Sequence, residues 1–244
     1  MLYAQTRLWI VLAWTGLFAS APAQPVRLNL GMNEKAIEQV IASKILLQIY
    51  NRAQLDAHVQ ALPAARSNKN LLDGLLDGEV ARVQIYVDKN PTLVKVTPAY
   101  YHLTTTAFAR SGSGISVKSK NDLARFRVGY VRGIAHAESI SEGLEKLDVI
   151  GTYEQMYKML EHDRIDIAID ADVNGQTRAK AMGYSDIVAV GSLATLELFH
   201  ILHPSQSSLA PKIGSTIVAM KKSGELERLV RQYENEAIQQ GVAR

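Results

Sequence analysis

The alternation of apolar and polar residues predicts a β-α-β-α-β order after the first 25 residues. Val26–Gly31 alternates and is typical of a strand, and Glu34–Arg52 carries apolar residues at helical spacing. Leu55–Leu62 alternates again, a helix that reaches Asp77 follows, and Val80–Val87 is a further apolar strand. Strands that alternate with helices in this order predict a parallel sheet with right-handed crossovers.

A second α/β series follows the extended stretch Tyr101–Ala109, beyond the linker-like residues Ser111–Gly114. The predicted elements are the helix Lys120–Ala124, the strand Arg127–Val131, the helix Ala135–Leu144, an extended piece near Val149, the helix Tyr153–His162, the strand Ile165–Ile169, the helix Asn174–Met182 and the strand Ile187–Val190. An extended stretch, Leu196–Leu202, and two helices, Leu209–Lys222 and Leu226–Gln239, complete the pattern.

Two segments of the chain repeat one pattern. Leu75–Val83 and Met159–Ile167 each contain the apolar end of a helix, a short polar turn and the start of a strand. The repeat predicts two similar α/β lobes, with two extended crossings near Ala109 and Gly191 that form a hinge beside a ligand-binding cleft. The predicted boundaries are 24–109 and 192–244 for the first lobe and 110–191 for the second.

The first 23 residues predict an export signal. Arg7 is followed by the apolar run Leu8–Phe18 and by the small residues of Ala19–Ala23, which is the order of a secretory signal. We expect cleavage after Ala23 and a periplasmic protein; the alternative is an uncleaved membrane anchor, for which the run is short. No cysteine follows the small residues, so a lipid-anchored N-terminus is excluded.

Composition excludes several classes of function. The 244 residues include 27 basic and 24 acidic residues but no basic run, so we expect no nucleic-acid partner. The absence of cysteine excludes disulfides and thiol nucleophiles. His200 and His203, with Glu197, have a spacing that is not diagnostic of a metal site. We expect no metal, no cofactor, no stable membrane insertion and a monomer.

Several short motifs, in this order, resemble those of periplasmic solute-binding proteins of bacterial family 3, which serve amino-acid-type ABC transporters. The motifs are Leu62-Pro63-x-x-Arg66; Gly78-Glu79-Val80; Pro98-x-Tyr100; Asn121-Asp122-Leu123, leading into Arg127-Val128-Gly129-Tyr130-Val131-x-Gly133; Met159-Leu160 with Arg164-Ile165-Asp166; and Met220-Lys221-x-x-Gly224. The resemblance implies a two-lobe type II periplasmic binding fold. It also implies a non-enzyme that captures a small anionic or zwitterionic, amino-acid-like ligand and delivers it to an ABC permease.

The chain departs from this family at the usual amino-acid clamp. Family members that bind α-amino acids place an arginine after the third strand, whereas this chain has Asp88–Pro91 there. A serine or threonine commonly follows the glycine at Gly133, where this chain has Ile134. These departures motivate an alternative, a sensory protein that signals to a membrane sensor kinase. A third reading is a periplasmic dehydratase with His136 or Glu138 as general acid.

Four residues of the first lobe are candidates for ligand contact. Arg66 lies at a predicted helix start, where a guanidinium can hold a carboxylate or phosphate; the alternative is a solvated or structural arginine. Arg82 interrupts an apolar strand, so it either meets a ligand anion or pairs with an acidic side chain of its lobe. Tyr86 and Tyr100 fit cleft walls, although core packing explains either equally well.

The second lobe supplies four more candidates. Arg132 and Gly133 precede a predicted helix start whose free backbone N–H groups favour an anion, although a turn explains the glycine equally well. Asp170 and Asp172 follow the next apolar strand, at the sheet edge where α/β proteins bind ligands. In the family that the chain resembles, an aspartate near this point holds the ligand ammonium; the alternative is a cap for the helix from Val173.

Overall fold

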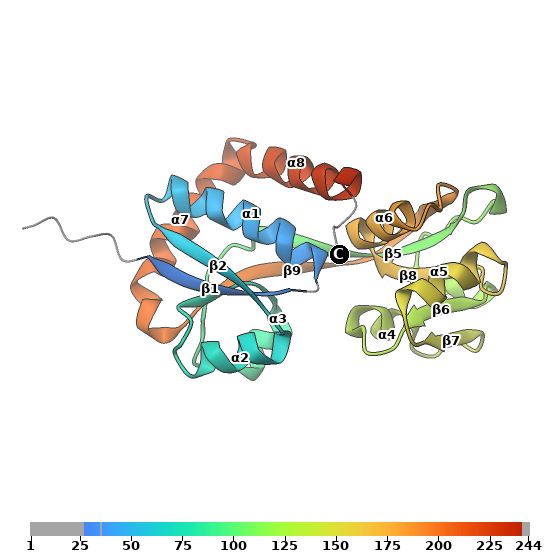
Figure 1. Ribbon diagram of the computed structural model, residues 1–244, viewed down its shortest axis with the longest axis horizontal. Helices are drawn as coiled ribbons and strands as arrows, with labels where there is room; N and C mark the ends of the chain where they lie inside the picture. Colours follow the sequence, from blue (N-terminus) through green and yellow to red (C-terminus); the bar gives the residue numbers. More distant parts are fainter. Residues whose placement is uncertain (1–26, 35, 241–244) are drawn as a thin grey trace, which may run out of the picture.

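The computed structural model describes residues 27–34 and 36–240, and the predicted signal peptide lies outside this part of the chain. The described residues form two α/β lobes that are joined by two long strands (Figure 1). This is the fold class that the sequence predicts. Within these residues, no helix is both long and apolar enough to cross a membrane.

The first lobe begins with three parallel strands, as the alternating pattern predicts. The elements are β1 Leu28–Asn33, α1 Ile37–Arg52, β2 Ala57–Leu62, α2 Ala64–Leu72 and β3 Gly78–Val83. β1 is central, because Leu30 lies opposite Val59 of β2 and opposite Gly78 of β3. The Asp77 carboxylate accepts the Asn29 backbone N–H at 2.8 Å, which fixes the start of β1 against β3.

The third strand is shorter than its apolar pattern predicts. The sequence predicts a strand that continues to Val87, but β3 ends at Val83 and the helix α3, Gln84–Lys89, follows at once. Val83 is the last residue of β3 that pairs with β9. Without a further strand partner, the backbone closes its hydrogen bonds locally, and the Gln84 amide donates to the Asp88 carboxylate at 2.7 Å one turn later.

Two strands run through both lobes. β5, Tyr101–Arg110, and β9, Ile187–Leu202, pair in antiparallel fashion along almost the whole of β5. The later part of β9 also pairs with β3 and with the short strand β4, Val94–Lys95, whereas β5 pairs with β8 of the second lobe. The two extended stretches predicted around Gly191 are therefore one continuous strand. The predicted lobe boundaries fall inside β5 and β9, and their positions stay a prediction.

The second lobe repeats the plan of the first. The elements are the 3-10 helix η2 Lys120–Arg125, β6 Val128–Val131, α4 Ala135–Ser141, β7 Leu147–Ile150, α5 Tyr153–Glu161, β8 Ile167–Ala171 and α6 Asp172–Ala181. β6 is central between the parallel strands β7 and β8. The predicted helix to Leu144 ends earlier, at Ser141, and Gly143 follows with φ 82°. A glycine in this left-handed region allows the turn that stops the helix.

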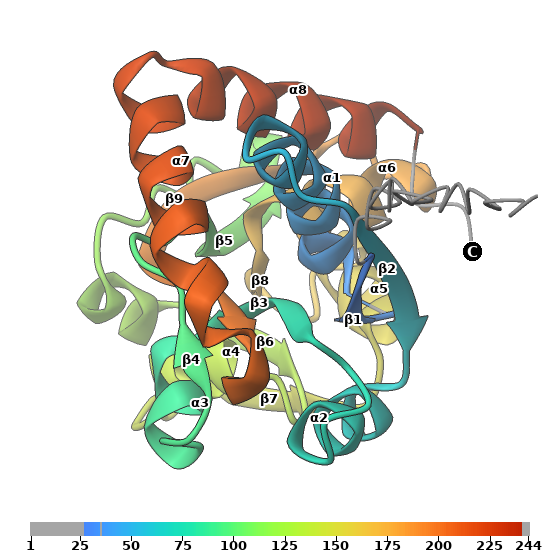
Figure 2. The same cartoon turned by 90° about the vertical axis from the view of Figure 1, so that its left-hand side faces the viewer.

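The C-terminal helices cover one side of the first lobe. The 3-10 helix η3, Pro204–Leu209, leads into α7, Ala210–Lys222, and α8, Glu225–Gln240. Figures 1 and 2 show α1, α7 and α8 on one side of the first-lobe sheet and α2 on the other. α8 also packs against α6, so this helix touches both lobes beside the hinge strands.

Each lobe has its own apolar core. In the first lobe, Leu30, Ile45 and Ile217 are among the fully buried residues between the sheet and the helices α1 and α7. In the second lobe, Phe108 and Tyr157 belong to a separate cluster beneath α5 and α6. Because the cores are separate, each lobe packs as a body of its own, and β5 and β9 are the main connections between them.

Candidate functional site

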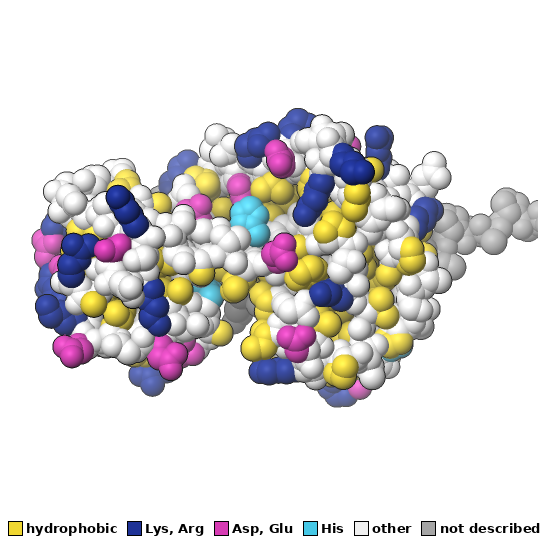
Figure 3. Space-filling view, turned by 180° about the vertical axis from the view of Figure 1, so that it is seen from behind, with side chains coloured by type: hydrophobic (Ala, Val, Ile, Leu, Met, Phe, Trp, Pro, Cys, Tyr) yellow, Lys and Arg dark blue, Asp and Glu magenta, His cyan; other side chains and the backbone are white. Residues whose placement is uncertain are grey.

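A gap of about 740 Å³ lies between the two lobes, on the side of the hinge strands that carries α3 and α4. Val83, Gln84 and Ile85 line it from the first lobe, and His136 and Ile140 line it from the second. In the space-filling view from behind, the molecule narrows between the lobes, and hydrophobic side chains lie on both sides of the notch (Figure 3). The gap adjoins the carboxyl ends of β3 and β6, which is where parallel α/β sheets bind ligands.

In the first lobe, Arg82 is held beside the gap by a buried carboxylate. Its Nε and Nη2 both donate to Glu79, with Nη2 at 2.7 Å from Oε1. The Glu79 side chain is 3% exposed and that of Arg82 is 21% exposed. Burial alone would lower the pKa of Arg82, but the hydrogen bonds and the charge of Glu79 raise it. The structure thus places the predicted Arg82 against an acidic side chain of its own lobe, and its partly exposed edge faces outward.

Arg82 also lies over the ring of Tyr86, with its guanidinium carbon 4.5 Å from the ring centroid. The Tyr86 hydroxyl donates to the side-chain amide oxygen Oδ1 of Asn68 at 2.6 Å, which fixes the ring. Burial and the nearby Glu79 charge raise the pKa of Tyr86 to about 12, so the phenol stays neutral. Tyr86 therefore supports the guanidinium of Arg82 as a flat neutral surface.

In the second lobe, Asp170 and Arg178 form a corresponding pair. Arg178 Nη1 donates to both carboxylate oxygens, at 2.7 Å and 3.0 Å. The Asp170 side chain is fully buried, whereas that of Arg178 is 20% exposed. Burial raises the pKa of Asp170 to about 6, so the carboxylate is ionised at pH 7 and balances the arginine. A ligand ammonium has no access to Asp170, and the group that this pair presents outward is a guanidinium.

The Arg178 guanidinium is held on a second side by an aromatic ring. Its carbon lies 3.5 Å from the ring centroid of Tyr153, at the start of α5. The Tyr153 side chain is half-buried. The Tyr157 hydroxyl donates to Asp170 at 3.3 Å from beneath. These contacts fix Arg178 in one orientation, which lowers the entropy lost when an anion binds to it.

His136 stands at the wall of the gap in a neutral form. Its Nδ1 lies 3.0 Å from the Thr105 hydroxyl. Burial, and then the charge of Arg178, lower the pKa of His136 to about 4. An imidazole with this pKa is uncharged at pH 7, so His136 lines the gap as a neutral polar group.

Three of the predicted residues lie at the surface near the ends of strands. Arg66, in the first turn of α2, and Arg132, directly after β6, are exposed, and neither side chain has a partner among the described residues. Gly133 has φ +81°, and a side chain at this position would have no neighbouring atom within 4 Å of its Cβ. The left-handed turn conformation, rather than a close contact, therefore explains this glycine. Its backbone N–H lies 3.4 Å from a carboxylate oxygen of Glu138.

The other two predicted residues have structural partners. Tyr100 is 2% exposed within the first-lobe core. Its hydroxyl donates to the Val80 backbone carbonyl at 2.8 Å, so Tyr100 belongs to the packing of the lobe. Asp172 occupies the first turn of α6 and accepts a hydrogen bond from Gln176 at 2.9 Å. Asp172 does not cap α6, because the N-cap position is Ala171 and has no side-chain cap.

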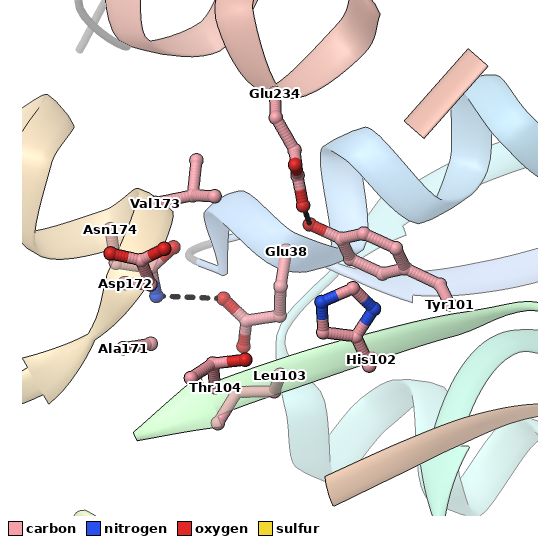
Figure 4. Close-up of a pocket in the computed structure, with 10 residues that line it drawn as sticks. All are labelled: Glu38, Tyr101, His102, Leu103, Thr104, Ala171, Asp172, Val173, Asn174 and Glu234. Carbon is pink, nitrogen blue, oxygen red and sulfur yellow. Dashed lines mark hydrogen bonds between the residues drawn. The ribbon is translucent and has the colours of Figure 1, made fainter. Parts of the chain in front are cut away.

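A second, smaller pocket lies on the opposite side of the hinge strands, between α1, α6 and α8 (Figure 4). Its volume of about 60 Å³ accommodates only one or two waters. The Asn174 amide donates to Glu38 at 2.8 Å and thereby links α6 of the second lobe to α1 of the first. Tyr101 donates to Glu234 of α8 at 3.1 Å in the same pocket. These contacts join the lobes next to the hinge.

His200 and His203, the two closely spaced histidines of the sequence, have structural partners. His200 is fully buried, with Nδ1 2.8 Å from the Glu79 backbone carbonyl and Nε2 2.8 Å from the Tyr50 hydroxyl. Because a carbonyl only accepts, Nδ1 carries the proton and Nε2 accepts from Tyr50. His203 is bonded to Ser205 instead. Among the described residues, no group of three or more histidine, aspartate and glutamate side chains could hold a metal ion.

Sequence reasoning missed Arg178, the residue that pairs with the buried Asp170 in the second lobe. Arg178 lies eight positions after Asp170, on a helix whose pattern gives no sign that one arginine bends back to the end of the preceding strand. The available signal was a buried acidic residue at a strand end, which requires a cationic partner nearby. That signal identifies the need for a partner but not which arginine meets it.

Comparison with known proteins supports the fold. No family model matches the sequence. An uncharacterized protein of Shewanella oneidensis is 28% identical over 180 residues, which cover 71% of this chain and 68% of that protein. Among solved structures, the L-cystine solute receptor of Neisseria gonorrhoeae, in its unliganded open conformation, has a TM-score of 0.70 at 14% identity, covering 86% of this chain and 92% of the receptor.

Two further solved structures have the same architecture. An ancestral arginine-binding protein bound to glutamine has a TM-score of 0.59 at 15% identity and covers 85% of this chain and 97% of its own. A histidine kinase sensor domain with similarity to periplasmic binding proteins has a TM-score of 0.61 at 16% identity, covering 85% and 95% of the two chains. The chain therefore has the two-lobe type II periplasmic binding fold, as its resemblance to family 3 implies.

Proposed function

We propose that this protein is a periplasmic solute-binding protein. It captures a small anionic or zwitterionic, amino-acid-like solute in the gap between the lobes and delivers it to an ABC permease, without catalysis. The observation that carries the proposal is the gap of about 740 Å³ between the lobes. Each lobe also has a partly exposed arginine, Arg82 or Arg178, that a buried carboxylate fixes in one orientation. A partly exposed guanidinium in a fixed orientation is a specific receptor for a carboxylate.

Binding acts through the relative position of the lobes. A ligand that contacts both walls of the gap binds the closed arrangement better than the open one and shifts the population toward closure. The separate cores allow each lobe to move as a body while β5 and β9 bend. The closed form then presents a surface that the membrane partner distinguishes from the open form.

Within this proposal, the predicted site residues have different roles. Arg82 contacts the ligand from the first lobe and Tyr86 supports it. Arg66, Arg132 and Gly133 lie at the ends of their strands and add favourable potential for an anion. Asp170 acts through Arg178, Asp172 lies beyond it at the start of α6, and Tyr100 holds the first-lobe core.

A sensory role is the second candidate. The same fold serves in a histidine kinase sensor domain, and the amino-acid clamp of family 3 is incomplete in this chain. Neighbouring genes separate the two roles, because permease and ATPase genes favour transport and a sensor kinase gene favours signalling. Both roles require export, and a mature protein that starts at Gln24 is the expected product of signal cleavage.

A thermal-shift screen of the mature protein tests the proposal. Amino acids, organic acids, polyamines and vitamins form the panel, because a tight ligand raises the melting temperature by mass action. We expect an anionic or zwitterionic compound to raise it, and Arg178→Gln to abolish that rise. Arg125→Gln, which alters an exposed arginine paired with Asp122 elsewhere on the second lobe, is the matched control. A panel without any shift would contradict the proposal.

A further inference from the structure

The two lobes touch each other on one side of the hinge strands and are apart on the other. In Figure 1, α6 and α8 lie on one side of β5 and β9, whereas the gap between α3 and α4 lies on the other side. α6 belongs to the second lobe, and it packs against both α1 and α8 of the first. The molecule is therefore joined along one edge and open along the other.

Two neighbouring residues of α6, Val173 and Asn174, contact the first lobe, and we refer to this as the α6 contact. The partly buried Val173 packs against the apolar core of the first lobe. Asn174 is 6% exposed, and its side-chain amide donates to Glu38 of α1 at 2.8 Å, a bond that crosses from one lobe to the other (Figure 4). The α6 contact thus combines apolar packing with a hydrogen bond to a carboxylate, which is stronger than a bond between neutral groups.

Other features of the same interface oppose this contact. The Oδ1 atom of Asn174 is buried and has no hydrogen-bond donor among the described residues. Separation of α6 from α1 exposes this oxygen to solvent, which lowers the free-energy cost of separation. Asp172 of α6 and Glu234 of α8 line the small pocket beside the contact. Burial raises the pKa of Glu234, the hydrogen bond from Tyr101 lowers it, and the charge of Asp172 raises it. Two acidic side chains that face each other across the lobes therefore weaken the contact.

The α6 contact and closure of the gap exclude each other on geometric grounds. Each lobe packs around a core of its own, so each moves as a body. The two bodies are connected by β5 and β9, which run between the gap and the α6 contact. A rotation about these strands that brings α3 toward α4 therefore moves α6 away from α1 and α8.

We propose that the α6 contact is a latch that holds the gap open, and that the lobes close only when Val173 and Asn174 leave the first lobe. The latch sets the ratio of open to closed molecules before any solute binds. A solute that favours the closed form must then outweigh the free energy of the latch. The strength of a contact outside the gap therefore tunes the apparent affinity of the gap.

A distance measurement between two spin labels tests the proposal in the mature protein without any solute. Because the 244 residues contain no cysteine, Lys89→Cys/Glu142→Cys labels only two sites, both exposed, at the end of α3 and directly after α4. Pulsed EPR gives the populations of long and short distances across the gap. We expect the long distance to dominate. Asn174→Ala should raise the ratio of short to long distances about tenfold, because a hydrogen bond to a carboxylate is lost.

Further variants grade the effect and control for changes that do not touch the α6 contact. Asn174→Asp places a second carboxylate opposite Glu38, and this repulsion should raise the ratio more than Asn174→Ala does. Val173→Ala removes part of the apolar packing and should raise the ratio about threefold. Arg52→Gln and Ala181→Ser alter exposed residues at the far ends of α1 and α6 and should leave the ratio unchanged. Circular dichroism verifies the fold of every variant.

The outcomes decide the proposal separately from the proposed function. A new short distance in the Asn174 and Val173 variants, with unchanged controls, supports the latch. An unchanged distribution in Asn174→Ala overturns it, and so does a short distance that already dominates without these substitutions. A broader distribution with no short maximum also overturns it, because the contact would then restrain the lobes without opposing closure. If Asn174→Asp fails to fold, Asn174→Ala and Val173→Ala decide the test. No solute enters the measurement, so its failure leaves the proposed solute-binding role standing.

Discussion

The two lobes share one plan but differ in how they hold their charges. Each lobe has a central first strand whose start is bound by an aspartate: Asp77 accepts the Asn29 backbone N–H and Asp166 accepts that of Arg127, both at 2.8 Å. In the first lobe, Glu79 and its arginine lie three residues apart around an irregularity in β3. In the second, Asp170 is the penultimate residue of β8, and its arginine comes from the following helix.

This difference shows which features a repeated fold preserves. The strand starts are equivalent because backbone register depends on the local sequence and the sheet. The buried ion pairs are equivalent only in their final geometry, since each lobe reaches that geometry from different positions in the chain. The two lobes therefore share the backbone contacts that fix strand register, but they build their buried ion pairs from different positions in the chain.

The largest expected effect comes from breaking the second-lobe pair. Asp170→Ala leaves the guanidinium of Arg178 without its carboxylate in a mostly buried site, and we expect a loss of roughly 3–5 kcal/mol in the free energy of unfolding. Urea unfolding measures it. Asp170→Asn/Arg178→Gln, which removes both charges, should recover most of this loss. A loss below about 1 kcal/mol in Asp170→Ala would contradict the view that the pair is desolvated.

A pH series compares the two buried histidines, His200 of the first lobe and His136 of the second. Burial lowers the pKa of each to about 4. The unfolded chain binds these protons near pH 6.5, so the unfolded state holds more protons between pH 6.5 and 4, and stability falls as the pH falls through this range. For His200 the loss by pH 4.5 is roughly 2–3 kcal/mol.

His200→Gln should remove the share of this pH dependence that His200 contributes. Urea unfolding of the variant and the wild-type protein at pH 7 and pH 4.5 gives the difference, which isolates one histidine from all other titrating groups. Ligand binding sharpens the comparison, because a carboxylate at Arg178 should raise the pKa of His136 but leave that of His200 unchanged, as NMR titration can measure. Equal slopes for variant and wild type would show that His200 is not buried as described.

The smallest expected effect tests the equivalence of the strand starts. Asp77→Ala and Asp166→Ala each remove the carboxylate that accepts a backbone N–H at the start of a central strand. We expect each to lower the free energy of unfolding by about 1–2 kcal/mol, with the larger effect at Asp166, which also pairs with the Arg127 guanidinium. Thermal unfolding measures both. A ratio of effects far from unity would indicate that the two lobes are not stabilised in the same way.

The sequence by itself determined the plan of the molecule. Local alternation and helical spacing predicted the order of strands and helices, and the repeated segments predicted two lobes, because these patterns report which face of each element is buried. The strand pattern singled out Arg82, which interrupts an apolar strand, and Asp170, which follows one, and each is a member of a buried ion pair. The strand predicted to Val87 was wrong, because its length depends on a partner strand that the local pattern does not reveal.

Only the tertiary structure decided how the charges are used. The sequence left Arg82 between a ligand anion and an acidic neighbour, and the fold brought it to Glu79. It offered Asp170 as a ligand contact, and the fold buried this carboxylate completely beneath Arg178, which no pattern had singled out. The physical reason is that the energy of a charge depends on its burial and on partners from distant segments, and both are set only when sheets and helices pack together.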